Sequence, residues 1–361
     1  MVVIRSLGSN SGGQLATGTT DDAHYLATTQ LPHDTNESGP AEWRVQGGGN
    51  HAWAINGTTL LGCGSNTDGE LATDHSSALL RWTAVTYPGS FVRQVACGWS
   101  HTLLLSDAGL YAAGSNGFGQ LGTQSNGSGW ARVVAGPRFV SIACGMRHSL
   151  ALDHDGVVWA WGANRCGQLG IAPGGDRATN NIPSPVPVSK GLLPIAMIAG
   201  GRSHSVLIAR DLTTVYVAGQ DRYAQCGPAS NSYVVGTWRM FQLPHAAVKL
   251  CAGWDFAAVL LDTHDVAVWG RADQGQLAQK VEEGLCCREL SRVELAGVHD
   301  IACGSSHMVA LTAEGAVYMW GWNEHGNAGD PTLANVYTPL CVEPMAVGIG
   351  CGYGNSYVIN Q

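Results

Sequence analysis

The sequence has little positive charge, and lysine is almost missing. Only three of the 361 residues are lysine, and with 16 arginines they face 27 acidic residues, so the formal net charge is -8. No run of basic residues occurs anywhere in the chain. Proteins that bind nucleic-acid phosphates or anionic membranes depend on such clusters. The sequence therefore predicts no direct contact with nucleic acid or with a membrane surface.

Long apolar segments are also missing. Hydrophobic residues make up 45% of the chain, yet no stretch approaches the roughly 18 apolar residues of a membrane-spanning helix. The first ten residues, MVVIRSLGSN, lack the charged start and long apolar core of a secretory signal. The 11 cysteines are odd in number, and most lie in apolar, strand-like runs, where a free thiol packs as a small hydrophobe. We expect a soluble protein of a reducing compartment, the cytoplasm and also the nucleus.

Glycine, in contrast, is abundant and recurs in order. The chain has 49 glycines, about twice the usual share. Seven corners begin with a glycine that is followed, in the clearest copies, by any residue and asparagine: Gly8, Gly64, Gly114, Gly162, Gly219, Gly270 and Gly321. A second motif alternates with the corners; it has a glycine, two variable residues and a marker position: His51, His101, His148, His204, Phe256, His307 and Asn355. Both sets indicate seven repeats of about 50 residues.

Each repeat has the pattern of short β-strands. Residues 148–152 and 157–161 are rich in β-branched and aromatic side chains, and Asp155-Gly156 lies in the turn between them. Such a unit cannot bury both faces alone, so seven units are predicted to close into an all-β, seven-bladed propeller. Residues 1–7 read as the second arm of a hairpin and residues 355–361 as the first arm. The two termini are therefore predicted to complete one blade of a single domain, residues 1–361.

Segments of the repeats resemble a known family. Residues 95–105 (VACGWSHTLLL) and 161–170 (WGANRCGQLG) are similar to the repeats of the regulator of chromosome condensation family, whose members are seven-bladed propellers. The resemblance extends over essentially the whole chain. Because this fold is used by exchange factors, a photoreceptor, an enzyme inhibitor and scaffolds, the resemblance indicates the fold more sharply than the function.

Within that family, the bare propeller and residues 320–329 (WGWNEHGNAG) are similar to the fungal alpha-tubulin suppressors. This resemblance implies a small CSL-type metal-binding protein as partner, with roles in diphthamide synthesis on elongation factor 2 and in Elongator-dependent modification of tRNA wobble uridines. The alternative is a guanine-nucleotide exchange factor for a Ran-like small GTPase. That activity would imply an inserted wedge and a basic tail, yet the longest intervals, residues 19–43 and 171–194, are only modestly expanded.

A light sensor like the plant ultraviolet-B receptor is a third alternative. It would imply Gly-Trp-Arg-His-Thr motifs on adjacent blades. Only Trp99 and Trp254 occupy the tryptophan position, three blades apart, and no arginine follows either one. The sequence therefore argues against light sensing.

No pattern of residues indicates an active site. The five marker histidines each belong to a different blade, so we interpret them as hydrogen-bonded core residues, and the same holds for Cys97, Cys144, Cys303 and Cys351. The vicinal pair Cys286-Cys287 is expected in a linker after residues 281–285 and lacks further ligands at zinc spacing. A phosphate-binding loop and a nucleophile elbow are also missing. The sequence predicts a protein that is not an enzyme and has neither cofactor nor metal.

The two variable residues before each marker position should lie at the same end of every blade. We predict that a partner binds there, at the following residues: Trp99, Met146, Arg147, Arg202, Trp254, Asp255 and Tyr353. Tryptophan, tyrosine, methionine and arginine are enriched at protein interfaces, and arginine suits an acidic partner. The alternative is that the aromatic residues only fill the central channel.

Overall fold

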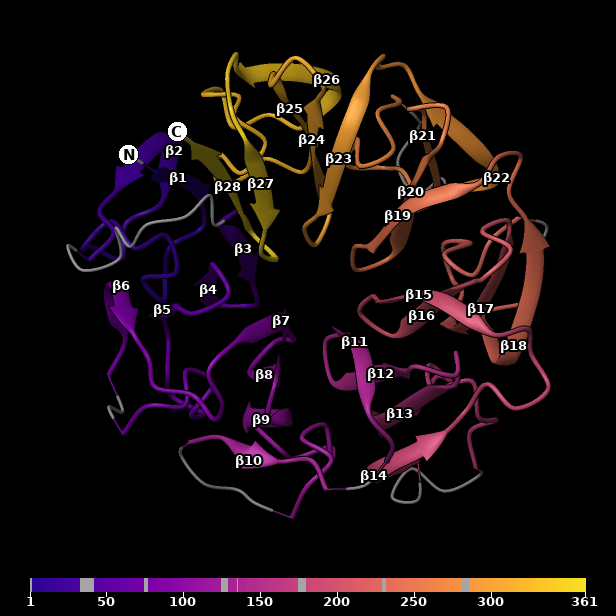
Figure 1. The fold of residues 1–361 in the computed structure, drawn as a ribbon. Helices are drawn as coiled ribbons and strands as arrows, with labels where there is room; N and C mark the ends of the chain where they lie inside the picture. Colours follow the sequence, from indigo (N-terminus) through magenta and orange to yellow (C-terminus); the bar gives the residue numbers. More distant parts are fainter. Residues whose placement is uncertain are drawn as a thin grey trace.

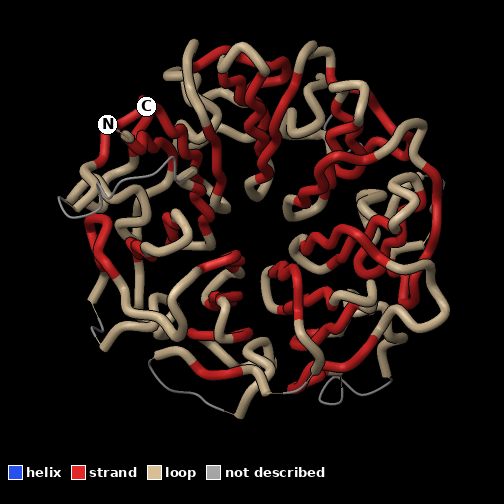
Figure 2. Tube along the Cα trace, in the orientation of Figure 1, coloured by secondary structure: helices blue, strands red, loops and turns tan. Residues whose placement is uncertain are grey.

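The structure is a computed structural model that describes residues 2–32, 42–74, 77–124, 129–134, 136–174, 180–228, 232–280 and 286–361. Its strands form seven antiparallel four-stranded sheets, which are arranged as blades around a central channel (Figure 1). The residues described contain strands and loops (Figure 2), and none of their segments forms a helix that could span a membrane. The prediction of an all-β, seven-bladed propeller is confirmed.

The blades are numbered here in chain order, with the terminal blade first. Blade 1 has β1 (Val3–Gly8), β2 (Ala23–Thr29), β27 (Gly348–Cys351) and β28 (Asn355–Asn360); blade 2 has β3 (Arg44–Gly47), β4 (His51–Ile55), β5 (Leu60–Gly64) and β6 (Leu79–Ala84); blade 3 has β7 (Val92–Cys97), β8 (His101–Ser106), β9 (Gly109–Gly114) and β10 (Ala131–Arg132). Blade 4 has β11 (Phe139–Cys144), β12 (His148–Asp153), β13 (Val158–Ala163) and β14 (Asn181–Pro187); blade 5 has β15 (Ile195–Gly200), β16 (His204–Ala209), β17 (Thr214–Gln220) and β18 (Val234–Gln242). Blade 6 has β19 (Ala247–Ala252), β20 (Phe256–Leu261), β21 (Val266–Arg271) and β22 (Cys286–Val293); blade 7 has β23 (Val298–Cys303), β24 (His307–Thr312), β25 (Val317–Gly321) and β26 (Val336–Glu343).

The two ends of the chain close the ring. In blade 1 the strand order is β2-β1-β28-β27, so β28 lies between β1 and β27. Val3 pairs with Asn360, and Gly8 pairs with Asn355. The prediction that the terminal segments share one blade is confirmed, except that Met1 lies outside the described residues.

Buried tryptophans donate hydrogen bonds from one blade to the blade before it. The fully buried Trp161 of blade 4 donates its indole N–H to the carbonyl of Gln120, which lies in the loop after β9 of blade 3, at 2.8 Å. Trp269 and Trp320 make the equivalent bond to the blade before their own. These three loops therefore stabilise the blade that follows them, as expected for a repeat that cannot fold alone.

The marker histidines also join neighbouring blades. His51 Nε2 lies 2.9 Å from Thr102 Oγ1, and the pairs His101–Ser149, His148–Ser205 and His307–Ser356 repeat this contact. His204 is the exception, because Ala257 occupies the hydroxyl position in blade 6. The glycine three residues before each histidine is required by close approach: a Cβ on Gly98 would lie 2.1 Å from His101 Cε1. The histidines are structural core residues.

The Gly-x-Asn corner has a local explanation. Gly162 has a φ of +97°, which is unfavourable for residues with a side chain. Asn164 then accepts a hydrogen bond from the amide of Leu169 at 3.0 Å and donates one to the carbonyl of Ile171 at 2.9 Å. A single asparagine side chain thus holds the loop closed, which explains why the motif recurs.

Candidate functional site

The variable residues of each repeat lie at one end of the channel, in what we name the inner row: residues 49–50, 99–100, 146–147, 202–203, 254–255, 305–306 and 353–354. Backbone hydrogen bonds join them from blade to blade. Trp99 N–H donates to the Met146 carbonyl at 3.1 Å, and Arg202 N–H donates to the Trp254 carbonyl at 3.0 Å. Trp254 and Tyr353 continue the chain of bonds on the other side of the ring. Because the main chain makes these contacts, the side chains are free to differ.

Three aromatic residues of the inner row meet over the channel. Trp99 of blade 3 stacks on Tyr353 of blade 1, with ring centroids 5.9 Å apart and an interplanar angle of 25°. Trp254 of blade 6 lies 6.0 Å from Trp99 and 5.8 Å from Tyr353. We name these three residues the aromatic triad. Trp99 is still 36% exposed, so the triad covers the channel and also presents apolar surface to the outside.

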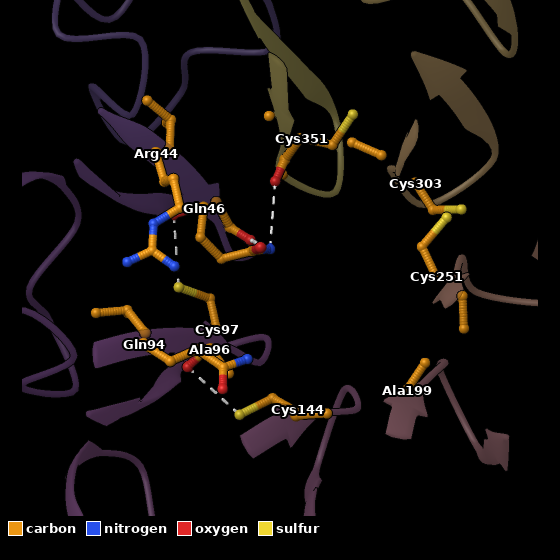
Figure 3. A pocket seen from close by; sticks show the side chains of 18 of the residues that line it. Arg44, Gln46, Gln94, Ala96, Cys97, Cys144, Ala199, Cys251, Cys303 and Cys351 are labelled. Atoms are coloured by element: carbon orange, nitrogen blue, oxygen red, sulfur yellow. Dashed lines mark hydrogen bonds between the residues drawn. The ribbon is translucent and has the colours of Figure 1, made fainter. Parts of the chain in front are cut away.

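A cavity of about 400 Å³ lies along the channel, and Tyr353 is one of its lining residues. Thiols from the inner strands also line it (Figure 3): Cys97, Cys144, Cys251, Cys303 and Cys351. Burial raises the pKa of the Cys351 thiol well above its ordinary value, and the Cys144 thiol donates to the Ala96 carbonyl at 3.4 Å. Thiols that remain protonated are poor nucleophiles and poor metal ligands. Burial likewise raises the pKa of the Cys144 thiol, so Cys144 and Cys351 act as packing residues rather than as reactive groups.

A buried ionic cluster lies beside the triad. Asp255 is 3% exposed, and its carboxylate is 3.5 Å from Arg202 and 3.9 Å from Arg271. Gln225 donates to it at 3.2 Å. Burial raises the pKa of Asp255, and the two guanidinium groups act in the opposite direction. Arg202 also lies 5.9 Å from the ring centroid of Trp254, so this cluster orients the side chains that border the triad.

The remaining two predicted site residues lie farther along the row. Met146 is partly buried and is joined to Trp99 through the main chain. Arg147 is exposed, and its guanidinium lies 4.7 Å from the ring of Phe118, in the corner of blade 3. The structure thus brings together Trp99, Trp254 and Tyr353, and it joins Arg202 and Asp255 to the same cluster.

Sequence reasoning missed the residues of the corners, which lie on this same face. The corners are defined here as residues 8–12, 64–68, 114–118, 162–166, 219–223, 270–274 and 321–325. Each is bonded to the inner row of its own blade; Ala163 N–H, for example, donates to the Arg147 carbonyl at 2.9 Å. The corners of blades 4, 5 and 6 carry Arg165, Arg222 and Arg271. Their position beside the repeated asparagine was the available signal. Inner row and corners together are named the docking face.

One prediction about cysteines is wrong. Cys286 and Cys287 do not lie in a linker but begin β22, where they pair with Arg271 and Gly270. Residues 281–285 lie outside the described residues. Seven of the eight residues in CCRELSRV are partly buried or exposed, and only Val293 is buried, which fits an outer strand of the blade. Within the described part of the chain, no group of three or more histidine, cysteine or acidic residues could hold a metal ion.

The corners, the marker histidines and the shared terminal blade define a seven-bladed propeller built from repeats of one type. The chain belongs to the RCC1-like domain family, whose family model matches residues 3–358. It is 30% identical to the mouse (Mus musculus) secretion-regulating guanine nucleotide exchange factor, over 99% of this chain and 84% of that protein.

Two solved structures show the same fold. Human WBSCR16 superposes with a TM-score of 0.86 at 22% identity and covers 100% of this chain and 99% of its own. Prp20p from Saccharomyces cerevisiae, described with its binding properties to Gsp1p and histones, gives a TM-score of 0.84 at 22% identity, over 99% of this chain and 91% of its own. At these identities the likeness concerns the fold alone.

Proposed function

We propose that this protein is a non-enzymatic interaction propeller that binds a partner protein across the docking face. The observation that carries the proposal is the aromatic triad, because three large rings from three different blades meet where the scaffold requires only main-chain contacts. Tryptophan and tyrosine supply large contact area at low conformational cost, and they are frequent at binding hot spots. The adjoining Arg202, which pairs with the buried Asp255, supplies a polar contact beside this apolar centre.

The identity of the partner is a finer proposal. The resemblance of residues 320–329 to the fungal alpha-tubulin suppressors supports a small CSL-type metal-binding protein, and with it roles in diphthamide synthesis and in Elongator-dependent modification of wobble uridines. Such a role would place the protein in the cytoplasm, with the nucleus as a second location. Affinity purification of the tagged protein from its own cells tests this directly. Recovery of a CSL-type protein with Elongator subunits supports the proposal, and recovery of a small GTPase instead supports the second candidate below.

Truncation of the triad should weaken binding of the purified partner. We expect Trp99→Ala and Trp254→Ala each to cost about 2 kcal/mol or more of binding free energy, which is roughly a thirtyfold rise in Kd. Isothermal titration calorimetry with the purified partner measures this cost. Circular dichroism at the same temperature checks that each variant remains folded.

The matched control is Phe91→Ala. Phe91 is 49% exposed and precedes the same inner strand, β7, at the end opposite to Trp99. The Phe91→Ala variant should bind the partner with the same Kd as the wild-type protein. If the two tryptophan variants fold and also bind with unchanged Kd, the triad is channel packing, and the interface lies away from the triad, most simply at the corner of blade 7 around Asn323, Glu324 and His325.

A second candidate function is guanine-nucleotide exchange on a small GTPase of the Ran type. The observation that favours it is the 30% identity to the secretion-regulating guanine nucleotide exchange factor over nearly the whole chain. A propeller of this kind would act by holding an altered conformation of the GTPase, without a phosphate site of its own. The docking face would then be the surface that contacts the GTPase.

The two candidates differ in one assay. We expect the purified protein not to accelerate release of a fluorescent guanine nucleotide from Ran, and not to bind GTP itself. The reason is that the sequence shows neither an inserted wedge nor a phosphate-binding loop. Stopped-flow fluorescence measures the release rate. Strong acceleration would replace the first candidate by the second.

A further inference from the structure

The arginines of the docking face are confined to one side of the ring. Blades 4, 5 and 6 carry all five that occur in the inner row and the corners: Arg147, Arg165, Arg202, Arg222 and Arg271. The same three blades contribute three aspartates, Asp221, Asp255 and Asp273. The inner row and corners of the other four blades contain Asp68 and Glu324 but no arginine or lysine. The docking face is therefore positive on one side and negative on the other.

Contacts join three of the five arginines into one cluster, and Arg147 and Arg165 lie on the adjoining blade 4. Tyr223 lies between two of them, with Arg222 at 5.4 Å and Arg271 at 4.9 Å from its ring centroid. Arg271 and Arg202 share the Asp255 carboxylate. Arg202 in turn borders Trp254 of the triad. We name this set of five arginines, with Tyr223, the arginine sector.

The arginine sector holds more positive charge than its own acids neutralise. Asp273 makes a bidentate ion pair with Arg271, with N–O distances of 2.6 and 2.7 Å. Asp255 is buried beneath the surface. No carboxylate among the described residues lies within ion-pair distance of Arg147, Arg165 or Arg222, and all three side chains are exposed. In a chain with a net charge of -8, this local surplus is a specific feature of the face.

We propose that the arginine sector binds an acidic segment of the partner, rich in aspartate and glutamate, that runs from the aromatic triad outward over blades 4 to 6. This inference rests on the proposed function and adds the chemistry of the partner. Guanidinium groups pair with carboxylates through charge-assisted hydrogen bonds. The buried Asp255 fixes Arg202 and Arg271 before the partner arrives, so less side-chain entropy is lost on binding. The negative blades on the other side disfavour the reverse orientation of such a segment.

The probe for the test is a fluorescein-labelled peptide of about twelve residues, mostly glutamate with one tryptophan, and its glutamine counterpart. The protein is the full chain. Fluorescence anisotropy at low salt should show binding of the glutamate peptide only. The double variant Arg165→Ala with Arg222→Ala should weaken it by about tenfold or more, as expected for lost charge-assisted bonds. Added salt should weaken binding by wild type more than by the double variant.

The matched control is Arg93→Ala with Arg138→Ala, which removes the same charge. Both arginines are exposed and line a cavity of about 450 Å³ near the start of β7 and β11, at the end opposite to the triad. This variant should bind the glutamate peptide within about twofold of wild type. An equal loss in both double variants, or equal binding of the glutamine peptide, would overturn the inference. Tighter binding of a single-stranded DNA oligonucleotide through the same two arginines would also overturn it, since the sector would then recognise phosphate.

Binding measurements with the natural partner distinguish a failure of this inference from a failure of the proposed function. If the partner loses affinity with Trp254→Ala but binds the Arg165, Arg222 double variant like wild type, the docking face is correct and the acidic segment is wrong. If neither variant changes the Kd, the partner binds neither at the triad nor at the arginine sector, and both proposals are wrong. If both variants weaken binding, both proposals are supported.

Discussion

Deletion of residues 355–361 should abolish the folded, soluble protein. It removes β28, the strand between β1 and β27, and with it the closure of the ring. Tyr357, Val358 and Ile359 are at most 2% exposed, and each buried side chain of this size contributes about 2 kcal/mol. Their sum is comparable to the total stability of a domain, about 5–15 kcal/mol. The edges of β1 and β27 would also be open to aggregation.

Two smaller changes at the C-terminus serve as comparisons for the deletion. Removal of the exposed Gln361 alone should leave the melting temperature unchanged. Tyr357→Ala should lower the unfolding free energy by about 3–5 kcal/mol, because Tyr357 is fully buried and donates its hydroxyl to the Gln14 carbonyl at 2.8 Å. Soluble yield and thermal unfolding by circular dichroism measure both effects. A deleted protein as stable as the full chain would show that the ring does not depend on the shared blade.

Mild acid should unfold the protein because of its buried histidines. Burial lowers the pKa of His51, His101 and His148 to about 3 in the folded protein, and that of His204 and His307 to about 4. The unfolded chain takes up these protons below about pH 6.5, while the folded protein does not until about pH 4. The unfolding free energy therefore falls as the pH falls through this window, by about 1.4 kcal/mol per pH unit for each histidine. Together, the five histidines lower the unfolding free energy by an amount equal to the total stability of a typical domain within about two pH units.

Denaturant titrations between pH 7.5 and pH 4.5 measure this dependence. His204→Asn is the matched variant, because Asn355 occupies the marker position in blade 1, and Ala52 in blade 2 stands at the position of the repeat that Ala257 occupies in blade 6. Its unfolding free energy should depend on pH less steeply than that of wild type, by about 1.4 kcal/mol per pH unit below pH 6.5. An unchanged slope in this variant would show that His204 is not held neutral in the folded protein.

The fold could be predicted from the sequence because its requirements are local and are repeated seven times. A corner such as Gly162 to Asn164 needs a positive φ and an asparagine amide, and these needs appear in the sequence at a regular interval. The split terminal blade followed from the same count, because the chain begins and ends inside the pattern. Cys286-Cys287 was misplaced because the outer strand of a blade, exposed and mixed in composition, has no repeated signal.

The positions of the candidate site were also predicted from the repeat, since Trp99, Trp254 and Tyr353 occupy one place in three copies. Only the tertiary structure decided that their rings meet over the channel, because the three come from blades separated by long stretches of chain. The same holds for Asp255 between Arg202 and Arg271, and for Tyr223 between two guanidinium groups. By itself the sequence determined the ring of blades, because each corner depends on the backbone conformation of a few neighbouring residues. The partners of each side chain on the docking face depend on how the ring closes, which no single repeat encodes.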